Sequence, residues 1–370
     1  MLRNKGCPGL QENPPALAKI TSPMTTSHDR VLQALNHERP DRVPRDFWAE
    51  TPALRRLLEY TRLPEEEALL QRLQVDMRHL NAVQPAEVEI APGVWQNYWG
   101  ERFIQKPTPW GPMREDLPGA LANVKGDADV PEAFEQFPWP TPDLFDYSGL
   151  TAQAAQHADY ALIYGFADVW QRPALVRGWE NMFLDMAARP DWIHYLCRKF
   201  TDFYKEDYTR AAEVTGGRID LYLLLSDLGS QHGPLVSLPM FRALIAPYLS
   251  EMVECVHGLG AKVMFHSCGD VIRFIPDLIE MGVDLLDPIQ PVNERMAPEA
   301  LQAQFGGQIA FHGGIDMQGV LPFGTPEQVQ AEVARYSDLL GQHGGYILAP
   351  THLFQPDVRP ENVLAMYAEV

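Results

Sequence analysis

From about residue 160 onward, patterns typical of strands and of helices alternate along this chain, and that alternation constrains the fold most strongly. Short apolar runs are each followed by a longer stretch with the apolar spacing of a helix. Short connections between such units favour a parallel sheet with helices packed outside it. Strands are expected at 160–164, 219–225, 262–265, 283–286, 309–311 and 346–348.

Start and stop signals place the helices between these strands. Gly282 is expected to end one helix, and the capping-box pattern from Thr325 to Gln328 to begin another. The N-terminal part is expected to hold a helix capped by Ser27 and two further strands, at 41–48 and 75–80. The expected longer helices are 52–73, 190–214, the stretch from Ser237 to Gly258, 271–281, 326–340 and one from Pro360.

Seven or eight strand–helix units in one chain of 370 residues predict a (β/α)8 TIM barrel. An open, doubly wound α/β sheet is the alternative. We expect a flexible tail at 1–26 and a single barrel domain at 27–370. Within that domain, the segment 84–150 is rich in tryptophan and proline and is interpreted as an inserted cap, or else as an irregular surface excursion. The alternation in 93–104 predicts a β-hairpin inside it.

Composition narrows the class of partner. The chain carries 49 acidic and 30 basic side chains, a formal charge of −19, which argues against nucleic acid and anionic membrane. The charge permits a cationic partner or a small-molecule ligand, and simple solubility is its favoured interpretation. No apolar stretch is long enough to span a membrane, and the N-terminus lacks the apolar core of a secretory signal. The four cysteines show no disulfide framework, so the predicted location is cytoplasmic.

Polar side chains follow strand after strand of the predicted barrel, where sites are built. They are Asp46, Asp227, His266 with Cys268, Asp287, His312 with Asp316, and His352. Each has an ordinary explanation as a helix cap or turn residue. Their repetition at one topological level favours a shared site. Phosphate-loop, dinucleotide-binding, HExxH and CxxC motifs are missing from the sequence, which leaves nucleotide binding without support.

The stretch 266–270, His-Ser-Cys-Gly-Asp, predicts a metal site. Alternate residues of a strand point to one face, so His266 and Cys268 lie roughly 6–7 Å apart at their Cα atoms and can close on one zinc ion. His352, after the last strand, is the expected third ligand, and three ligands leave an open position for substrate. Asp270, Asp227 or His312 can instead complete the site or orient a ligand. A plain polar loop is the alternative.

These motifs together resemble the uroporphyrinogen decarboxylase superfamily over about residues 28–370. The resemblance rests on Pro40–Pro44, Arg177–Glu180 with Asp185, Ser226-Asp227 with Gly233-Pro234, His266–Gly269, Phe311–Asp316, and Pro350–His352 with Pro360–Asn362. It implies a (β/α)8 barrel with its site at the strand ends. True decarboxylases carry an arginine-rich Arg-Gln-Ala-Gly-Arg-Tyr loop after the first strand, whereas this chain has only Arg45 in the corresponding stretch 45–50.

The resemblance is nearest to the zinc-dependent branch, which transfers methyl groups with a corrinoid partner protein. It implies a methyltransferase that moves a methyl group between a small methylated substrate, or a thiol or folate acceptor, and that partner. Asp227, Asp287 and His312 are then the expected catalytic residues. The implied assembly is a possible homodimer. The alternatives are a metal-free decarboxylase acting on a tetrapyrrole or other polycarboxylate, and a non-catalytic binding protein.

Overall fold

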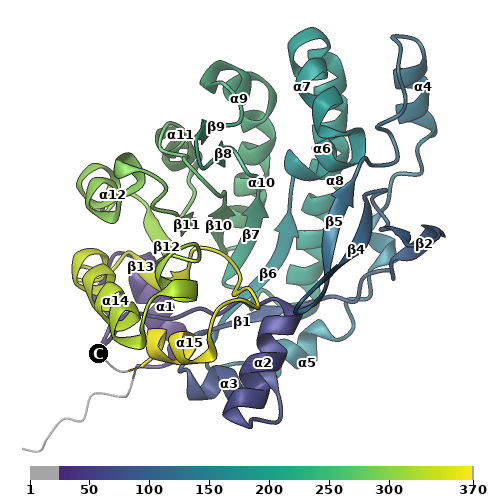
Figure 1. The fold of residues 1–370 in the computed structure, drawn as a ribbon. Helices are drawn as coiled ribbons and strands as arrows, with labels where there is room; N and C mark the ends of the chain where they lie inside the picture. Colours follow the sequence, from purple (N-terminus) through teal and green to yellow (C-terminus); the bar gives the residue numbers. More distant parts are fainter. Residues whose placement is uncertain (1–24, 369–370) are drawn as a thin grey trace, which may run out of the picture.

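A curled parallel sheet forms the centre of the computed structural model, which describes residues 25–368 (Figure 1). Most of the tail predicted at 1–26 lies outside the described residues. Seven strands of the described chain make this sheet, in the order β1-β6-β7-β10-β11-β12-β13, and every neighbouring pair is parallel. Their bounds are β1 (Met77–Leu80), β6 (Ala161–Ala167), β7 (Leu221–Leu225), β10 (Lys262–His266), β11 (Leu285–Ile289), β12 (Ala310–Ile315) and β13 (Tyr346–Pro350).

The stretch expected as a strand at 41–48 is not assigned as one, so the described residues show seven of the seven or eight strands expected. Its extended backbone instead touches both edges of the sheet. Leu348 of β13 donates to Pro44 O at 2.8 Å and accepts from Asp46 N at 2.9 Å. Just ahead of β1, Asp76 N donates to Arg45 O at 2.8 Å. Because these bonds are few, only isolated bridges are assigned, at Arg45 and Ala49.

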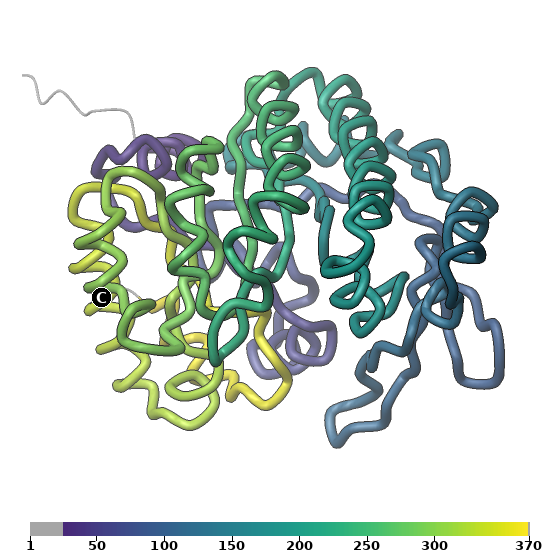
Figure 2. Tube along the Cα trace, turned by 90° about the horizontal axis from the view of Figure 1, so that it is seen from above, coloured from purple at the N-terminus to yellow at the C-terminus, as the bar shows by residue number. Residues whose placement is uncertain are grey.

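Helices cover the outside of the sheet (Figures 1 and 2). They are α1 (Ser27–Leu35), α2 (Thr51–Thr61), α3 (Glu66–Arg72), α5 (Leu150–Gln156), α6 (Gln171–Arg177), α7 (Trp179–Ala188), α8 (Pro190–Thr215), α9 (Leu238–Leu244), α10 (Ala246–Gly258), α11 (Ile275–Met281), α12 (Pro298–Phe305), α13 (Val320–Phe323), α14 (Pro326–Leu340) and α15 (Pro360–Met366). None of the helices within 25–368 is long and apolar enough to cross a membrane.

Several helix boundaries differ from the expectation because of local chemistry. The helix expected at 52–73 is two helices, since Arg62 adopts the left-handed conformation and Pro64 follows it. The helix expected from Ser237 to Gly258 is also divided, between α9 and α10, beside Pro247. Thr26 rather than Ser27 caps α1. Gly282 ends α11 in the left-handed conformation, as predicted.

The strands have two apolar faces, as a parallel sheet buried on both sides requires. One face packs against the surrounding helices in the main core. The other face points inward and forms a smaller cluster that includes Met77, Ile163, Leu221, Leu223, Met264, Leu285, Ala310 and Ile347. Val31 and Leu35 of α1 close this inner cluster, and Gly345 N, just ahead of β13, donates to Ala34 O at 2.7 Å. Helix α1 therefore covers the amino ends of the strands.

The segment 84–150 holds a second, antiparallel sheet on one side of the molecule, drawn in blue in Figure 2. Its elements are β2 (Val88–Ala91), β3 (Val94–Gln96), β4 (Arg102–Thr108), β5 (Gly111–Leu117), α4 (Asp129–Gln136) and a 3-10 turn at Pro142–Leu144. Trp95 of β3 pairs with Phe103 of β4, which confirms the predicted hairpin. Trp99 is fully buried and stacks on Phe200 of α8 at 4.1 Å, so this segment shares the main core.

The capping box that begins α14 gives a first prediction. Thr325 Oγ accepts from Gln328 N, and the Gln328 side chain accepts from Thr325 N at 2.8 Å. Replacing Thr325 by alanine leaves one of the helix's first amides without its partner, so the free energy of unfolding is expected to fall by about 1 kcal/mol. Urea denaturation measures the change. Asp338→Ala on the exposed face of the same helix is the control, with an expected change within about 0.5 kcal/mol.

Candidate metal centre

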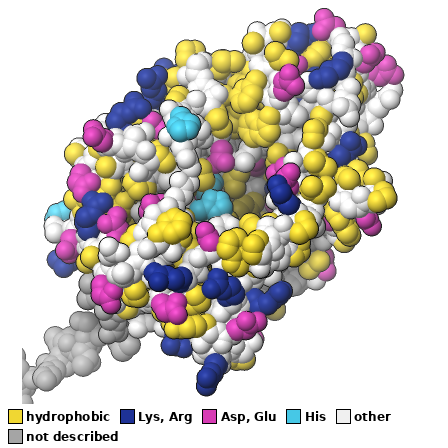
Figure 3. Space-filling model, viewed as in Figure 1, with side chains coloured by type: hydrophobic (Ala, Val, Ile, Leu, Met, Phe, Trp, Pro, Cys, Tyr) yellow, Lys and Arg dark blue, Asp and Glu magenta, His cyan; other side chains and the backbone are white. Residues whose placement is uncertain are grey.

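A polar layer lies directly above the inner apolar cluster, at the carboxyl ends of the strands. Side chains two residues apart on a strand share a face, so each polar residue follows an inward apolar one. His79 follows Met77, His266 follows Met264, Asp287 follows Leu285 and His312 follows Ala310. Figure 3 shows the face of Figure 1, hollowed at its centre, with histidine and acidic side chains in the hollow. A small cavity of about 20 Å³ there is lined by His266, Asp287, His312, His352, Trp48 and four apolar or proline residues.

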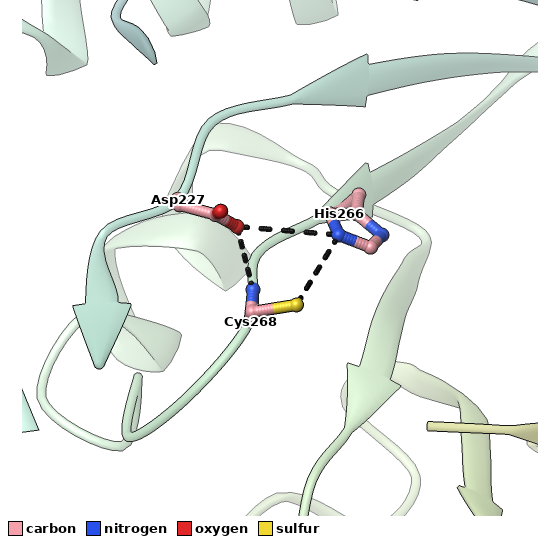
Figure 4. Close-up of side chains that lie close together, drawn as sticks. All are labelled: Asp227, His266 and Cys268. Atoms are coloured by element: carbon pink, nitrogen blue, oxygen red, sulfur yellow. Dashed lines mark hydrogen bonds and ion pairs between the residues drawn. The ribbon is translucent and has the colours of Figure 1, made fainter. Parts of the chain in front are cut away.

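Asp227, His266 and Cys268 form a cluster of potential metal ligands (Figure 4). One ligand atom from each lies within 4.8 Å of the others. His266 Nε2 is 3.6 Å from Cys268 Sγ and 4.0 Å from Asp227 Oδ1. Asp227 comes from the loop after β7, His266 ends β10, and Cys268 lies in the loop that follows, so two neighbouring strands supply the three side chains.

Backbone contacts fix the loop that carries Cys268. Asp227 Oδ1 accepts from Cys268 N at 2.8 Å, which places the carboxylate beside the thiol. Gln290 Oε1 accepts from Gly269 N at 2.7 Å. Gly269 has φ +82°, and a Cβ there would lie 2.6 Å from the backbone of Ser230, so only glycine fits. The loop is therefore held on both sides, and the sulfur has a defined position.

Asp287 bridges two histidines from inside the sheet. Its Oδ2 accepts from His266 Nδ1 and its Oδ1 from His312 Nδ1, each at 2.6 Å. Because the Nδ1 of His266 is engaged, its Nε2 is the nitrogen that faces Cys268. Burial opposes ionisation of Asp287, but the two imidazoles dominate and lower its pKa below the usual range. A histidine oriented by a carboxylate in this way is a common arrangement around protein-bound metals.

The network continues from His312 to Asp46, which the sequence analysis placed at this level, and to His79, which it did not. His312 Nε2 is 3.2 Å from Asp46 Oδ2, and His79 Nε2 is 3.4 Å from Asp46 Oδ1. Both ring nitrogens of His312 therefore meet carboxylates, which requires an imidazolium and leaves no lone pair for a metal. Burial alone would lower the pKa of His312, but Asp287 and Asp46 raise it to about 9. For Asp46, His79 and His312 outweigh burial and lower the pKa.

The remaining predicted residues lie in different positions. His352 is exposed on the loop after β13 and stands outside the three-residue cluster found in the described chain. It lines the cavity of His266 and also a neighbouring one that reaches Cys268. Asp270 is turned away, since its Oδ2 accepts from Asn293 Nδ2 and from an Arg295 guanidinium nitrogen. Asp316 accepts from Gln318 N within its own turn.

Asp46 was recognised as a polar residue past the first expected strand, but His79 was missed. His79 lies two residues after Met77, whose side chain points into the inner cluster, and near the end of β1. That spacing could have indicated that His79 joins the polar layer. His312 was expected to follow a strand, yet it lies within β12 together with Gly313 and Gly314. A Cβ at Gly314 would meet the ring of Tyr336 at 2.4 Å, so these glycines serve close packing inside the strand.

Asp287→Asn tests the orienting contact. The amide can accept from one histidine but its NH2 group then faces the other, so His266 loses its fixed orientation. Zinc affinity is expected to fall by about 10–100-fold, the usual effect of removing such a carboxylate. Competition with a chromophoric chelator measures it. Asp284→Asn, just before β11, where the half-buried Asp284 contacts His257 and Lys262, is the control and should leave zinc affinity unchanged.

Comparisons with known proteins give a matching family and a similar fold. The sequence model described as uroporphyrinogen decarboxylase (URO-D) matches residues 170–370, more than half of the chain. The chain belongs to the uroporphyrinogen decarboxylase family. One similar solved structure is a methyltransferase from Methanosarcina mazei, with 15% identity and a TM-score of 0.62. The match covers 92% of this chain and 97% of that one, and at this identity it shows a shared fold. No curated protein sequence matches.

Some of the residues that pointed to the uroporphyrinogen decarboxylase family lie in the candidate site, and others stabilise the fold. Asp227 and the loop of Cys268 lie in the ligand cluster. Arg42 lies at the opposite end of the strands, where it contacts Asp76 Oδ2 at 2.7 Å. Residues of the family motifs therefore also form ion pairs that stabilise the fold. The cluster of Asp227, His266 and Cys268 is the part that bears on metal binding.

Proposed function

We propose that this protein is a zinc-dependent methyltransferase whose metal is held by His266, Cys268 and a third ligand beside them. The observation that carries the proposal is the 3.6 Å separation of His266 Nε2 and Cys268 Sγ. Bond lengths of ~2.0 and ~2.3 Å at a tetrahedral angle place such atoms about 3.5 Å apart. The donor set therefore fits zinc. When bound, zinc supplies Lewis acidity to the oxygen, nitrogen or sulfur that carries or accepts the methyl group.

Asp227 is the third ligand that the geometry favours, and His352 is retained as the alternative. Asp227 lies within the cluster and is positioned by the amide of Cys268. His352 lines the cavities of both His266 and Cys268 from the last strand. Three ligands leave a position for substrate in either case. If His352 binds the metal, Asp227 is left to exchange a proton with the substrate.

Asp287 and His312 act on the site through His266 and not on the substrate. Asp287 presents the Nε2 of His266 to the metal, and His312 stabilises Asp287 as a carboxylate. The cavity beside the cluster is lined largely by apolar groups, among them Trp48, Pro288 and Leu353. Such a wall suits a small methylated group and excludes water from the reacting centre.

The finer elements of the fold belong to the same proposal. We infer that the extended residues around Arg45 close the sheet into a barrel by joining β13 to β1, and that the segment 84–150 caps one side of its mouth.

The corrinoid that exchanges the methyl group is proposed to arrive on a partner protein, by resemblance to the zinc-dependent branch of the family. The homodimer stays a prediction.

A tetrapyrrole decarboxylase has less support. Such an enzyme would need cationic groups for many carboxylates, and Arg45 is the arginine of the corresponding stretch. Its guanidinium is buried and donates to Leu73 O at 3.1 Å and Tyr367 O at 2.9 Å, at the packed back of the sheet. The guanidinium of Arg45 therefore stabilises the fold and is not available to bind a substrate carboxylate.

The proposal is tested by methyl transfer itself. Zinc-loaded protein is mixed with cob(I)alamin and a set of small methyl ethers, methylated amines and thioethers, and methylcobalamin is followed by its absorbance. Formation that depends on zinc and is lost in Cys268→Ala supports the proposal. Decarboxylation of uroporphyrinogen by zinc-free protein, with no methyl transfer to cobalamin, would contradict it.

A further inference from the structure

A second cavity lies between the strand ends and the segment 84–150. Its volume is about 60 Å³. Its polar and aromatic lining includes His79, Tyr98, Tyr164, Phe166, Arg172 and Tyr204. A larger adjoining cavity of about 450 Å³, a volume typical of small-molecule sites, shares Tyr98 and Arg172 with it and reaches Leu225 at the end of β7. Arg172 thus stands where the two cavities meet.

Both cavities adjoin the proposed metal centre. Leu225 is paired in register with His266. Gln171 lines the larger cavity, and its Oε1 accepts from Asp227 N at 3.4 Å. On the other side, the ring of His79 packs edge-on against Trp48 at 4.8 Å, and Trp48 lines the cavity of His266. The space beside Arg172 therefore lies next to residues that contact the proposed centre.

The guanidinium of Arg172 has hydrogen-bond donors that the described residues do not use. Its Nη1 lies 3.3 Å from Glu101 Oε1, and the buried Nε has no hydrogen-bond partner among residues 25–368. Tyr204, only 4% exposed on α8, lines the same cavity, and no described residue hydrogen-bonds its hydroxyl. Burial raises the pKa of Tyr204 well above its usual range, so the hydroxyl keeps its proton. Arg172 of α6 and Tyr204 of α8 thus both line one cavity.

The acidic groups around Arg172 also have other partners, although Glu101 Oε1 remains paired with Arg172. Glu101 Oε2 accepts from Asn97 Nδ2 at 2.6 Å and lies 3.1 Å from an Arg114 nitrogen. Asp168 accepts three backbone amides, those of residues 170, 171 and 172. Asp207 Oδ1 accepts from the hydroxyls of Tyr147 and Tyr164 at 2.8 and 2.9 Å. An added anion would therefore share the guanidinium of Arg172 with Glu101, whose charge is also shared with Asn97 and Arg114.

We propose that Arg172 and Tyr204 form a carboxylate subsite that anchors the substrate, with its methylated end toward His266 and Cys268. A guanidinium matches the two oxygens of a planar carboxylate, and the phenol adds a third hydrogen bond. The aromatic side chains of the cavity suit a flat apolar body behind that carboxylate. The orientation of the substrate rests on the proposed function, whereas the anion site itself does not require zinc.

Calorimetric titration of the zinc-free protein with benzoate, benzamide and benzylammonium tests the subsite. Benzoate should bind wild-type protein at least tenfold more tightly than the other two. Arg172→Gln should abolish that preference, and Tyr204→Phe should weaken benzoate binding several-fold with an unchanged Tm. Arg242→Gln, which removes an exposed surface arginine paired with Asp277, should leave the affinity for benzoate unchanged.

Three results would overturn the subsite. They are no benzoate binding to wild-type protein at millimolar concentration, tighter binding of benzylammonium, and wild-type benzoate affinity in folded Arg172→Gln. Cys268→Ala separates the two proposals, because it should bind benzoate normally. If wild-type protein takes up no zinc but its benzoate preference depends on Arg172, the methyltransferase proposal fails and the carboxylate subsite stands.

Discussion

Replacing Cys268 by alanine is expected to abolish stoichiometric zinc binding and, with it, methyl transfer. The thiolate is the strongest zinc donor of the cluster, and its sulfur lies 3.6 Å from the His266 nitrogen that would share the ion. Loss of a direct ligand should cost more affinity than the ~10–100-fold typical of an orienting residue. We therefore expect at least a hundredfold loss, measured by chelator competition and by metal content after dialysis.

Cys255→Ala is the matched control for that experiment. Cys255 is a half-buried thiol on α10 whose sulfur lies 4.0 Å from Lys205 O, away from the cluster. It should keep full zinc content. Asp227→Asn and His352→Ala then identify the third ligand, because only the variant that removes it should lose zinc as Cys268→Ala does. Full zinc occupancy in Cys268→Ala would contradict the proposed centre.

His312→Asn is expected to be the most destabilising substitution in the polar layer. The imidazolium lies between two buried carboxylates, 2.6 Å from Asp287 and 3.2 Å from Asp46. Asparagine can donate to only one of them, so a buried charge is left without its partner. Breaking a buried ion pair in this way typically costs about 3–5 kcal/mol. Urea denaturation of the zinc-free protein measures the loss. His257→Asn, at the more exposed pair with Asp284, should cost less than about 1 kcal/mol.

The same variant has a pH signature. The pKa of His312 is raised to about 9 in the folded protein, against 6.5 for an unperturbed histidine. A raised pKa means that the folded state holds the proton more tightly. Its stabilising contribution is complete below about pH 6.5 and is lost as pH rises through about 9. Wild-type stability should therefore fall by about 3 kcal/mol across that window, and His312→Asn should show a flatter curve. Equal slopes for both proteins would contradict the imidazolium assignment.

Much of the fold follows from local pattern. The apolar runs that became β7 and β10 are short and bounded by polar or glycine residues, and Gly282 and Thr325 carry end signals that act within one helical turn. The residues around Arg45 were harder to place. Their extended backbone is stabilised by edge contacts with β13 and with Asp76, which come from distant parts of the sequence. A pattern within the segment cannot reveal how many of those contacts form.

Only part of the candidate site could likewise be predicted from local sequence. The spacing of His266 and Cys268 predicts that they face one another, because strand geometry sets it. Asp227 joins them through a hydrogen bond to the amide of Cys268, which depends on the paths of two loops. The link from Asp46 to His79 depends on side chains from opposite ends of the N-terminal region meeting inside the sheet. Such contacts arise from tertiary packing and leave no periodic signal.

Zinc K-edge X-ray absorption of the zinc-loaded protein tests the central claim most directly. The account predicts one sulfur at about 2.3 Å, with nitrogen or oxygen ligands at about 2.0 Å that include an imidazole. The sulfur shell should disappear in Cys268→Ser and persist in Cys255→Ala. A wild-type spectrum without a sulfur neighbour, or a protein that retains no zinc under metal-replete conditions, would contradict it.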